Sequence, residues 1–331
     1  MTGTDRRDIS QSVAFEPHPW LLWTAPPKVR DRTTTRFAPA PTGRLHLGHV
    51  ANALFVWGLA RRAVGMVLLR IEDHDRQRSR GFYERALLDD LDRLGLAADE
   101  PSTAELRAGA SSYRQSDNAG VYEEAFQHLK TVADVYPCTC TRSTFSAWSA
   151  ANGASWTGPG CPGGCRDRDV SNEDTVSVRV DLGDGDAAWT DMLAGERSGS
   201  VALAGDLVVY DRNRNWTYPF CVVVDDLRHG VDLVIRGEDL IDATPAQIRL
   251  GQLLGRKNQP TFAHHPLVLR PDGSKLSKAD GATAVGELLD GGRTRAELFS
   301  EAARAVGLTE SPDPLPFEQA LELVDELEVR P

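Results

Sequence analysis

Two β-prone segments separated by one helical segment place the strongest constraint on how this chain folds. Residues 34–38 are β-prone and end at a turn rich in proline and glycine, and apolar side chains recur at helical spacing over residues 50–60. An almost purely apolar run at residues 66–71 is typical of a strand buried on both faces, and a second helical segment ends at Gly95. Strand, helix, strand and helix within about 60 residues form a βαβ unit. The sequence therefore predicts an α/β fold with a parallel sheet.

The pattern of residue types changes several times along the rest of the chain. Residues 138–200 are rich in Gly, Pro, Ser and Asp, so we expect an insertion there and not a continuation of the sheet. Strands are predicted at residues 207–210, 221–224 and 233–235, and helices at residues 245–254 and beyond residue 285. We divide the chain into five parts. They are an N-terminal extension (residues 1–32), the first half of an α/β domain (33–137), the insertion (138–200), the second half of the domain (201–285) and a short helical segment (286–331).

Composition excludes several classes of protein. A hydrophobic fraction of 41% and a charged fraction of 26% exclude a mainly disordered or fibrous chain. The extension holds four prolines and no apolar signal segment, so we expect a partly disordered tail, with packing through Trp20 and Trp23 as the alternative. No run of about 18 apolar residues occurs, so we expect no membrane span and a cytoplasmic location. The net charge of −11 excludes binding of nucleic acid by bulk charge, which leaves a local basic face.

Two short segments far apart in the chain have the residue types that bind phosphate. His46, Gly48 and His49 follow the first turn at the predicted start of a helix, where free N–H groups attract anions. Lys275 and Lys278 lie on a glycine-flanked loop and suit the shifting charge of a triphosphate. Each segment alone has a plainer reading, as a helix cap or a solvated loop. The two together are a far more specific signal for a nucleotide site.

Four of the five cysteines have the spacing of a metal site. Cys138 and Cys140 form one close pair, and Cys161 and Cys165 form a second pair twenty residues later. Two such pairs on a loop make the tetrahedral thiolate site of structural zinc, and this stretch has few large apolar residues to order it otherwise. Free thiols and disulfides are the alternatives. Cys221, beside three valines in a predicted strand, is expected to be a core thiol.

The chain resembles class I aminoacyl-tRNA synthetases in both phosphate-binding segments, which look like the two ATP-binding motifs of that family. The segments at residues 36–43, 70–73, 222–226 and 235–239 stand in the order of the glutamyl branch, and the resemblance covers roughly residues 34–290. The resemblance is closest to the glutamyl-queuosine tRNA(Asp) synthetases, which also have valine at the position of Val222. The resemblance implies a Rossmann-like catalytic domain with a zinc-binding insertion. Because the chain ends soon after Lys278, we expect no anticodon-binding domain.

The resemblance also implies roles for individual residues. His46, Gly48, His49, Lys275 and Lys278 are assigned to ATP, and His46, His49 and Lys278 among them to catalysis. The residues assigned to glutamate are Arg36, Phe37, Ala38, Pro39, Ala40, Glu72, Tyr218 and Arg236. Ala40 departs from the family, which has serine there, so a substrate hydrogen bond is in doubt.

Within the glutamate site, the resemblance gives the α-ammonium to Glu72, the carboxylates to Arg36 and Arg236, and an aromatic wall to Tyr218. A solvated acidic turn or a divalent metal site is the alternative for the segment that begins at Glu72. Asp225 and Asp226 follow a predicted strand, and we expect a structural or ribose-side role.

The implied reaction has two steps. Glutamate attacks the α-phosphate of ATP, held with Mg²⁺, to give glutamyl adenylate without tRNA. The adenylate then acylates queuosine in the tRNA(Asp) anticodon. The expected partners are ATP, L-glutamate and the tRNA(Asp) anticodon stem-loop, with one Zn²⁺ per chain and no obligate protein partner. A repurposed glutamyl synthetase that acylates another acceptor, and a non-catalytic nucleotide- or RNA-binding protein, are the alternatives.

Overall fold

The predicted βαβ unit is present in the computed structural model, which describes residues 32–157, 160–168, 170, 176–203, 205–270 and 283–328. Strand β1 (Thr34–Phe37) leads into helix α2 (Leu47–Arg62), and β2 (Met66–Leu69) pairs with β1 in parallel. Helix α3 (Gly81–Leu94) ends at Gly95, whose φ of 75° is left-handed and favours glycine. Trp20 and Trp23 lie outside the described residues, so that prediction stays untested.

The two parallel strand pairs lie next to each other. Strands β8 (Leu233–Gly237) and β9 (Thr261–His265) are parallel, and β1 runs beside β8, where the Thr34 carbonyl accepts from the Asp232 amide at 3.0 Å. The carboxyl ends of these strands therefore meet at one edge, which is where crevices form in such sheets.

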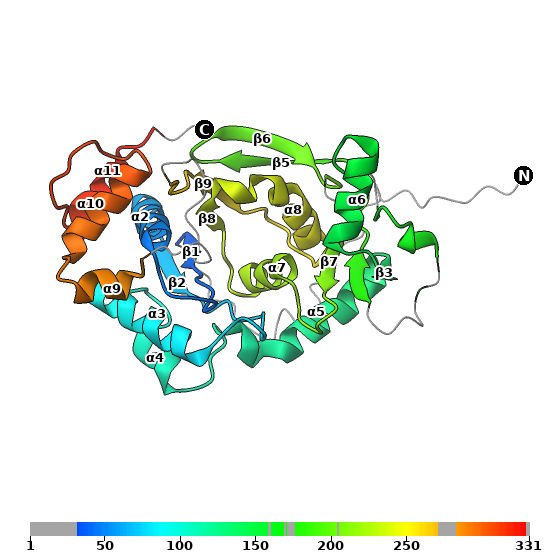
Figure 1. Cartoon of the computed structure of the whole chain (residues 1–331), viewed down its shortest axis with the longest axis horizontal. Helices are drawn as coiled ribbons and strands as arrows, with labels where there is room; N and C mark the ends of the chain where they lie inside the picture. The colour runs from blue at the N-terminus through cyan, green and yellow to red at the C-terminus, as the bar shows by residue number, and fades with distance from the viewer. Residues whose placement is uncertain are drawn as a thin grey trace, which may run out of the picture.

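The strand β5 (Asp186–Asp191) pairs with β9 in parallel and with β6 (Gly195–Ser200) in an antiparallel hairpin. The expectation that residues 138–200 do not continue the sheet is therefore wrong for these two strands. The hairpin crosses the top of the molecule in Figure 1, above helix α8 (Thr244–Leu253). Strand β6 has no large apolar residue and is mostly exposed, so it shows no alternation that pattern analysis could detect.

The valine run at residues 221–224 is helical, so the strand predicted there is wrong. These residues lie in α7 (Tyr218–Arg228), which begins with a proline in its first turn and packs against α8. A short apolar run cannot be assigned to strand or helix by periodicity alone, and burial on all sides overrides the β preference of valine. Asp225 and Asp226 therefore lie on a buried helix and not at a strand end.

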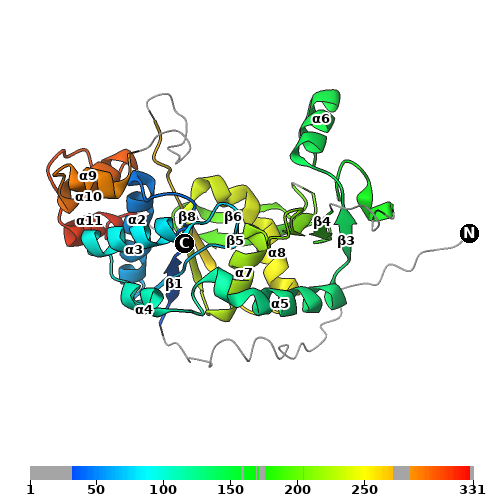
Figure 2. The same ribbon diagram turned by 60° about the horizontal axis from the view of Figure 1, so that its bottom comes forward.

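A second, smaller sheet is separate from the parallel one and packs against α7. It contains β3 (Val135–Cys138), β4 (Ser177–Val180) and β7 (Leu207–Tyr210), all antiparallel, and α6 (Arg142–Asn152) follows β3. Helix α5 (Ala119–Val132) leads into it from α4 (Thr103–Ala108). Figure 2 shows β3, β4 and α6 at the opposite end of the molecule from the last three helices.

Two of those last helices pack on α2 and complete its burial, and the third packs on α3. They are α10 (Arg295–Ala305) and α11 (Phe317–Asp325) on α2, and α9 (Val285–Asp290) on α3, and Figure 1 shows the three grouped at one end of the molecule. Helix α11 approaches so closely that a Cβ on Gly58 would lie 2.6 Å from the Cβ of Val324. Within the described residues, no separate anticodon-binding domain follows the sheet, and no helix is both long and apolar enough to cross a membrane.

Candidate active site and metal centre

A cleft opens at the carboxyl ends of β1, β2 and β8. It has a volume of about 630 Å³, and a recess of about 320 Å³ adjoins it. The predicted residues that line the cleft are Arg36, Ala38, His46, Gly48, His49, Glu72, Tyr218 and Arg236, and the recess adds Phe37, Pro39 and Ala40. Every predicted glutamate residue and every histidine-segment residue thus faces one space. Lys275 and Lys278 lie outside the described residues.

The first phosphate-binding segment forms the N-terminus of α2. The His46 Nδ1 accepts from the Gly48 amide at 3.1 Å, and the His49 Nδ1 accepts from the His46 amide at 3.1 Å. A neutral ring whose Nδ1 accepts carries its proton on Nε2, so both imidazoles are fixed as Nε2 donors. The His46 ring lies so close to Gly48 that a Cβ there would be 2.9 Å from its Cε1. Capping and anion binding are therefore compatible roles for these histidines.

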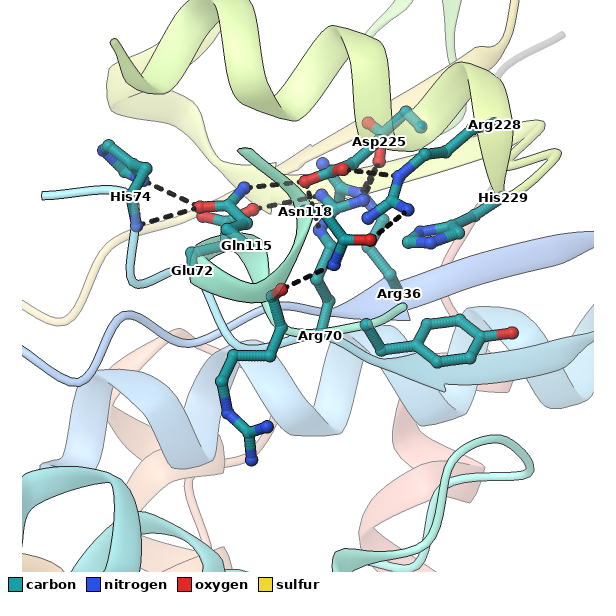
Figure 3. A network of polar contacts seen from close by, with 12 residues as sticks. Arg36, Arg70, Glu72, His74, Gln115, Asn118, Asp225, Arg228 and His229 are labelled. Atoms are coloured by element: carbon teal, nitrogen blue, oxygen red, sulfur yellow. Dashed lines mark hydrogen bonds and ion pairs between the residues drawn. The ribbon is translucent and has the colours of Figure 1, made fainter. Parts of the chain in front are cut away.

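A buried arginine, Arg70, joins the acidic residues behind the cleft. Its NH2 donates to Glu72 Oε1 at 3.0 Å and its NH1 to Asp226 Oδ1 at 2.7 Å, and its Nε lies 3.8 Å from Asp225 Oδ2. The side chain is fully buried, and Figure 3 shows the polar network around it. Arg70 therefore contacts three carboxylates, one just after β2 and two on α7.

Asp226 also holds Arg36, the predicted carboxylate binder. Its Oδ1 accepts from Arg36 Nε at 3.0 Å, while Arg36 NH1 donates to the Ile235 carbonyl at 3.1 Å. Burial favours the neutral acid, but Arg36 and Arg70 hold the pKa of Asp226 well below its ordinary value. Asp226 is therefore a permanent anion that orients two arginines.

Asp225 belongs to the same network on its far side. It accepts from Gln115 Nε2 at 2.8 Å, from the Tyr122 hydroxyl at 3.0 Å and from Arg228 Nε at 2.8 Å. The cleft is not lined by Asp225 or by Asp226. Of the two predicted roles for these residues, the structural one fits these contacts.

Glu72 and Tyr218 face the cleft from opposite elements. Burial raises the pKa of Glu72 above its ordinary value, although the charge of Arg70 opposes the rise. Burial, followed by the charge of Glu72, raises the pKa of the half-buried Tyr218. An ammonium group placed beside Glu72 would offset the energetic cost of burying its negative charge. This suits the role predicted for the carboxylate.

Arg236 is more constrained than its predicted role suggests. Its Nε donates to His264 Nε2 at 3.1 Å, its NH2 donates to Thr244 Oγ1 at 2.7 Å, and its NH1 donates to Gln247 Oε1. Arg236 and Tyr218 both line the cleft. The guanidinium is therefore held from several sides at a single orientation.

The four clustered cysteines come together as predicted. Their sulfur atoms all lie within 4.8 Å of one another, with 3.4 Å between Cys140 and Cys161 and 3.8 Å between Cys140 and Cys165. These spacings exceed a disulfide bond of about 2.05 Å and match the separation of about 3.8 Å that Zn–S bonds of about 2.3 Å give around a tetrahedral ion. The residues present therefore fit a metal ion.

Neighbouring groups favour the thiolate at Cys165, whereas burial raises the pKa of Cys138 and that of Cys140. Burial acts to raise the pKa of Cys165, but hydrogen bonds with Thr139 and Arg168 lower it to about 6. The Arg179 Nε donates to Cys138 Sγ at 3.2 Å. A Cβ on Gly163 would lie 2.6 Å from Cys140 Sγ, so the turn between the second pair of cysteines needs glycine. Cys221 is fully buried in α7, as expected of a core thiol, although in a helix.

Comparison with known proteins identifies the family. The family model of class I tRNA synthetases (E and Q), catalytic domain, matches residues 32–314. This chain belongs to that family. The glutamyl-Q tRNA(Asp) synthetase of Symbiobacterium thermophilum is 39% identical over 298 residues, which cover 88% of this chain and 91% of that protein. The predicted family and fold class are confirmed, and the chain is a ligase of the class I synthetase type.

Other relatives of this synthetase are longer. Glutamate–tRNA ligase 2 of Acidithiobacillus ferrooxidans is 38% identical over 280 residues, which cover 82% of this chain but 57% of that protein. The crystal structure of the glutamate-tRNA synthetase from Elizabethkingia anophelis superimposes with a TM-score of 0.71 at 23% identity, and covers 91% of this chain and 67% of that one. That likeness shows the shared fold.

Two residues of this synthetase that contact the site, Arg70 and His264, were not predicted from the sequence. Arg70 was part of a matched segment but had no role, although a single arginine in an otherwise apolar buried strand signals a buried ion pair. His264 was not singled out, and its place in a short strand between Ala263 and His265 gives no sign that it contacts Arg236. Both side chains contact predicted site residues from behind the cleft.

Proposed function

We propose that this synthetase activates L-glutamate with ATP and transfers it to queuosine in the tRNA(Asp) anticodon. The observation that carries the proposal is the cleft itself, which gathers Glu72, Tyr218, Arg36 and Arg236 beside the N-terminus of α2. The relative named glutamyl-Q tRNA(Asp) synthetase, matched over nearly its whole length, supports the choice of acceptor.

The amino-acid end of the cleft has the charges that glutamate needs. The α-ammonium of the substrate pairs with Glu72, whose carboxylate is buried at the end of β2. The negative charges pair with Arg36 and Arg236, which offer planar guanidinium donors from β1 and β8. Tyr218 forms the aromatic wall between them. Ala40 offers no hydroxyl, so the side-chain contacts depend on the two arginines.

The nucleotide end is the start of α2. The Nε2 donors of His46 and His49 face the phosphates of ATP, which binds as its Mg²⁺ complex, and the dipole of α2 favours their negative charge. A carboxylate oxygen of glutamate attacks the α-phosphorus, and the bond to the bridging oxygen of pyrophosphate breaks. The histidines stabilise the charge that develops on the α-phosphate, and we assign Lys275 and Lys278 to the pyrophosphate side from the sequence alone.

The metal centre has a structural role in this proposal. Cys138, Cys140, Cys161 and Cys165 hold one Zn²⁺, which supplies a cross-link between β3 and the loop at residues 161–165. We also place the protein in the cytoplasm, where ATP and tRNA occur together.

The test separates activation from transfer. Pyrophosphate exchange is measured with glutamate and ATP in the absence of tRNA, and exchange is expected. Transfer is then measured with queuosine-containing tRNA(Asp), unmodified tRNA(Asp) and tRNA(Glu), and only the first is expected to accept glutamate. A non-catalytic protein would bind ATP without exchange.

A second candidate is a short glutamate–tRNA ligase, which the 38% identity to glutamate–tRNA ligase 2 favours. The same experiment decides between the two. Exchange that needs tRNA(Glu), with that tRNA charged at its 3′ end, would replace our proposal with this one.

A further inference from the structure

Three buried side chains from three neighbouring strands form a hydrogen-bonded chain behind the cleft. Asp191 at the end of β5 contacts His264 of β9, with 2.5 Å between Oδ2 and Nδ1, and His264 contacts Arg236 of β8, with 3.1 Å between Nε2 and Nε. His264 and Arg236 are direct partners in the strand register. All three residues are at least 95% buried. Only Arg236 among them lines the cleft.

The contacts allow a single tautomer of His264. A guanidinium can only donate, so the His264 Nε2 that faces Arg236 must accept. The neutral ring therefore carries its proton on Nδ1 and donates it to Asp191. Burial lowers the pKa of His264, so the ring stays neutral near pH 7.

The carboxylate of Asp191 is itself fixed by the backbone. Its Oδ1 accepts from the amides of Leu193 and Ala194 at 3.0 and 3.1 Å. A rigid turn after β5 thus determines the orientation of Asp191, which determines the tautomer of His264, which in turn provides the acceptor for Arg236.

We propose that Asp191 and His264 are positioning residues that set the orientation of Arg236 toward the amino-acid substrate. The inference rests on the proposed function, because it concerns the same glutamate site. Thr244 and Gln247 hold the two terminal nitrogens of Arg236, and His264 supplies the acceptor for the third. Without that acceptor the Nε–H is buried without a partner and the guanidinium turns away from the cleft wall.

Asp191→Asn is the most informative substitution because it preserves shape. Two backbone amides require an oxygen at the Oδ1 position, so the new amide nitrogen faces His264. Its N–H groups force His264 Nδ1 to accept, and the ring proton moves to Nε2, where it faces the N–H of Arg236. An equivalent Asp-to-Asn change in serine proteases produces the wrong histidine tautomer.

A pair of substitutions at His264 separates its two contacts. In His264→Asn the amide nitrogen takes the place of Nδ1 and keeps the bond to Asp191, but the acceptor for Arg236 is lost. In His264→Gln the longer side chain brings an amide oxygen to the place of Nε2 and keeps that acceptor. We expect Asp191→Asn and His264→Asn to raise the KM for glutamate at least about tenfold. The KM for ATP should stay within about twofold, and His264→Gln should lie closer to wild type.

Two controls make the test specific. Asp90→Asn alters a carboxylate that is equally buried but lies on α3 facing α9, and it should leave both KM values unchanged. Nitrogen-15 NMR of the histidine rings, assigned with His264→Gln, reports the tautomer without any activity. It should show a protonated Nδ1 in wild type and a protonated Nε2 in Asp191→Asn.

The outcomes are distinguishable. A wild-type His264 protonated on Nε2 would overturn the proposal, as would folded Asp191→Asn and His264→Asn variants that keep the wild-type KM for glutamate. Equal rises in the KM for glutamate and in the KM for ATP would show that Asp191 and His264 have only a structural role, and this result would also overturn the proposal. If wild type exchanges no pyrophosphate with glutamate, the proposed function fails, whereas the NMR result still decides whether the hydrogen-bonded chain exists.

Discussion

Replacing Arg70 with methionine tests how the buried charges behind the cleft are balanced. Methionine fills most of the same space but supplies no charge. Asp226 would keep Arg36, and Asp225 would keep Gln115, Tyr122 and Arg228. Glu72 would lose the guanidinium 3.0 Å from its Oε1. The electrostatic cost therefore concentrates on Glu72.

Proton uptake by Glu72 sets an upper limit on that cost. Removing one partner of a buried ion pair costs about 3–5 kcal/mol. Glu72, with an ordinary pKa of 4.5, can instead take up a proton, which costs about 3.4 kcal/mol at pH 7 and about 0.7 kcal/mol at pH 5. We therefore expect Arg70→Met to lose about 3 kcal/mol of stability at pH 7 and under about 1 kcal/mol at pH 5.

The sign follows from the direction of the pKa shift. Without Arg70, burial raises the folded-state pKa of Glu72 further. The variant therefore keeps its stability at pH values below the pKa that Glu72 has in the unfolded chain, and loses it as the pH rises through the pKa that Glu72 has in the folded state. At pH 7 much of Glu72 would be neutral, and we expect the affinity for glutamate to fall at least about tenfold while that for ATP holds.

Urea unfolding at pH 5 and pH 7 measures the stabilities, and titration calorimetry measures the affinities. The matched control is the double variant Arg70→Met with Glu72→Gln, which removes the unpaired carboxylate and should recover most of the lost stability at pH 7. An equal loss at both pH values, or no recovery in the double variant, would refute the assignment of the cost to Glu72.

Three further predictions concern the metal centre, the lysine loop and α3. Cys161→Ser should lower the zinc content of the purified protein below one ion per chain, and full zinc by metal analysis would remove Cys161 from the site. Lys278→Ala should slow pyrophosphate exchange about a hundredfold with little change in glutamate affinity, whereas an unchanged rate would exclude Lys278 from catalysis. Burial raises the pKa of Asp90 to about 6, so the contribution of Asp90 to stability should fall as pH rises from about 4 through about 6, and unfolding measurements on Asp90→Asn should lack that contribution when compared with wild type.

The sequence by itself determined the features that depend on local spacing. The βαβ unit follows from periodicity within about 60 residues. The placement of His46 and His49 at the start of α2 follows from the turn before them. The cysteine cluster follows from two close pairs, although a metal ion can use them only because the loop between them folds back. Each signal lies within a short stretch, where backbone geometry dictates which side chains are neighbours.

Only the tertiary structure decided which side chains control the site. The contact of Arg36 with Asp226 spans 190 residues, and that of Arg70 with Asp226 spans 156. The Asp191 to His264 contact spans 73 residues and depends on a hairpin that the sequence concealed. The valine run became a helix because its surroundings bury every face of it. Contacts between distant segments are set by how the whole chain packs, so local spacing carries no record of them.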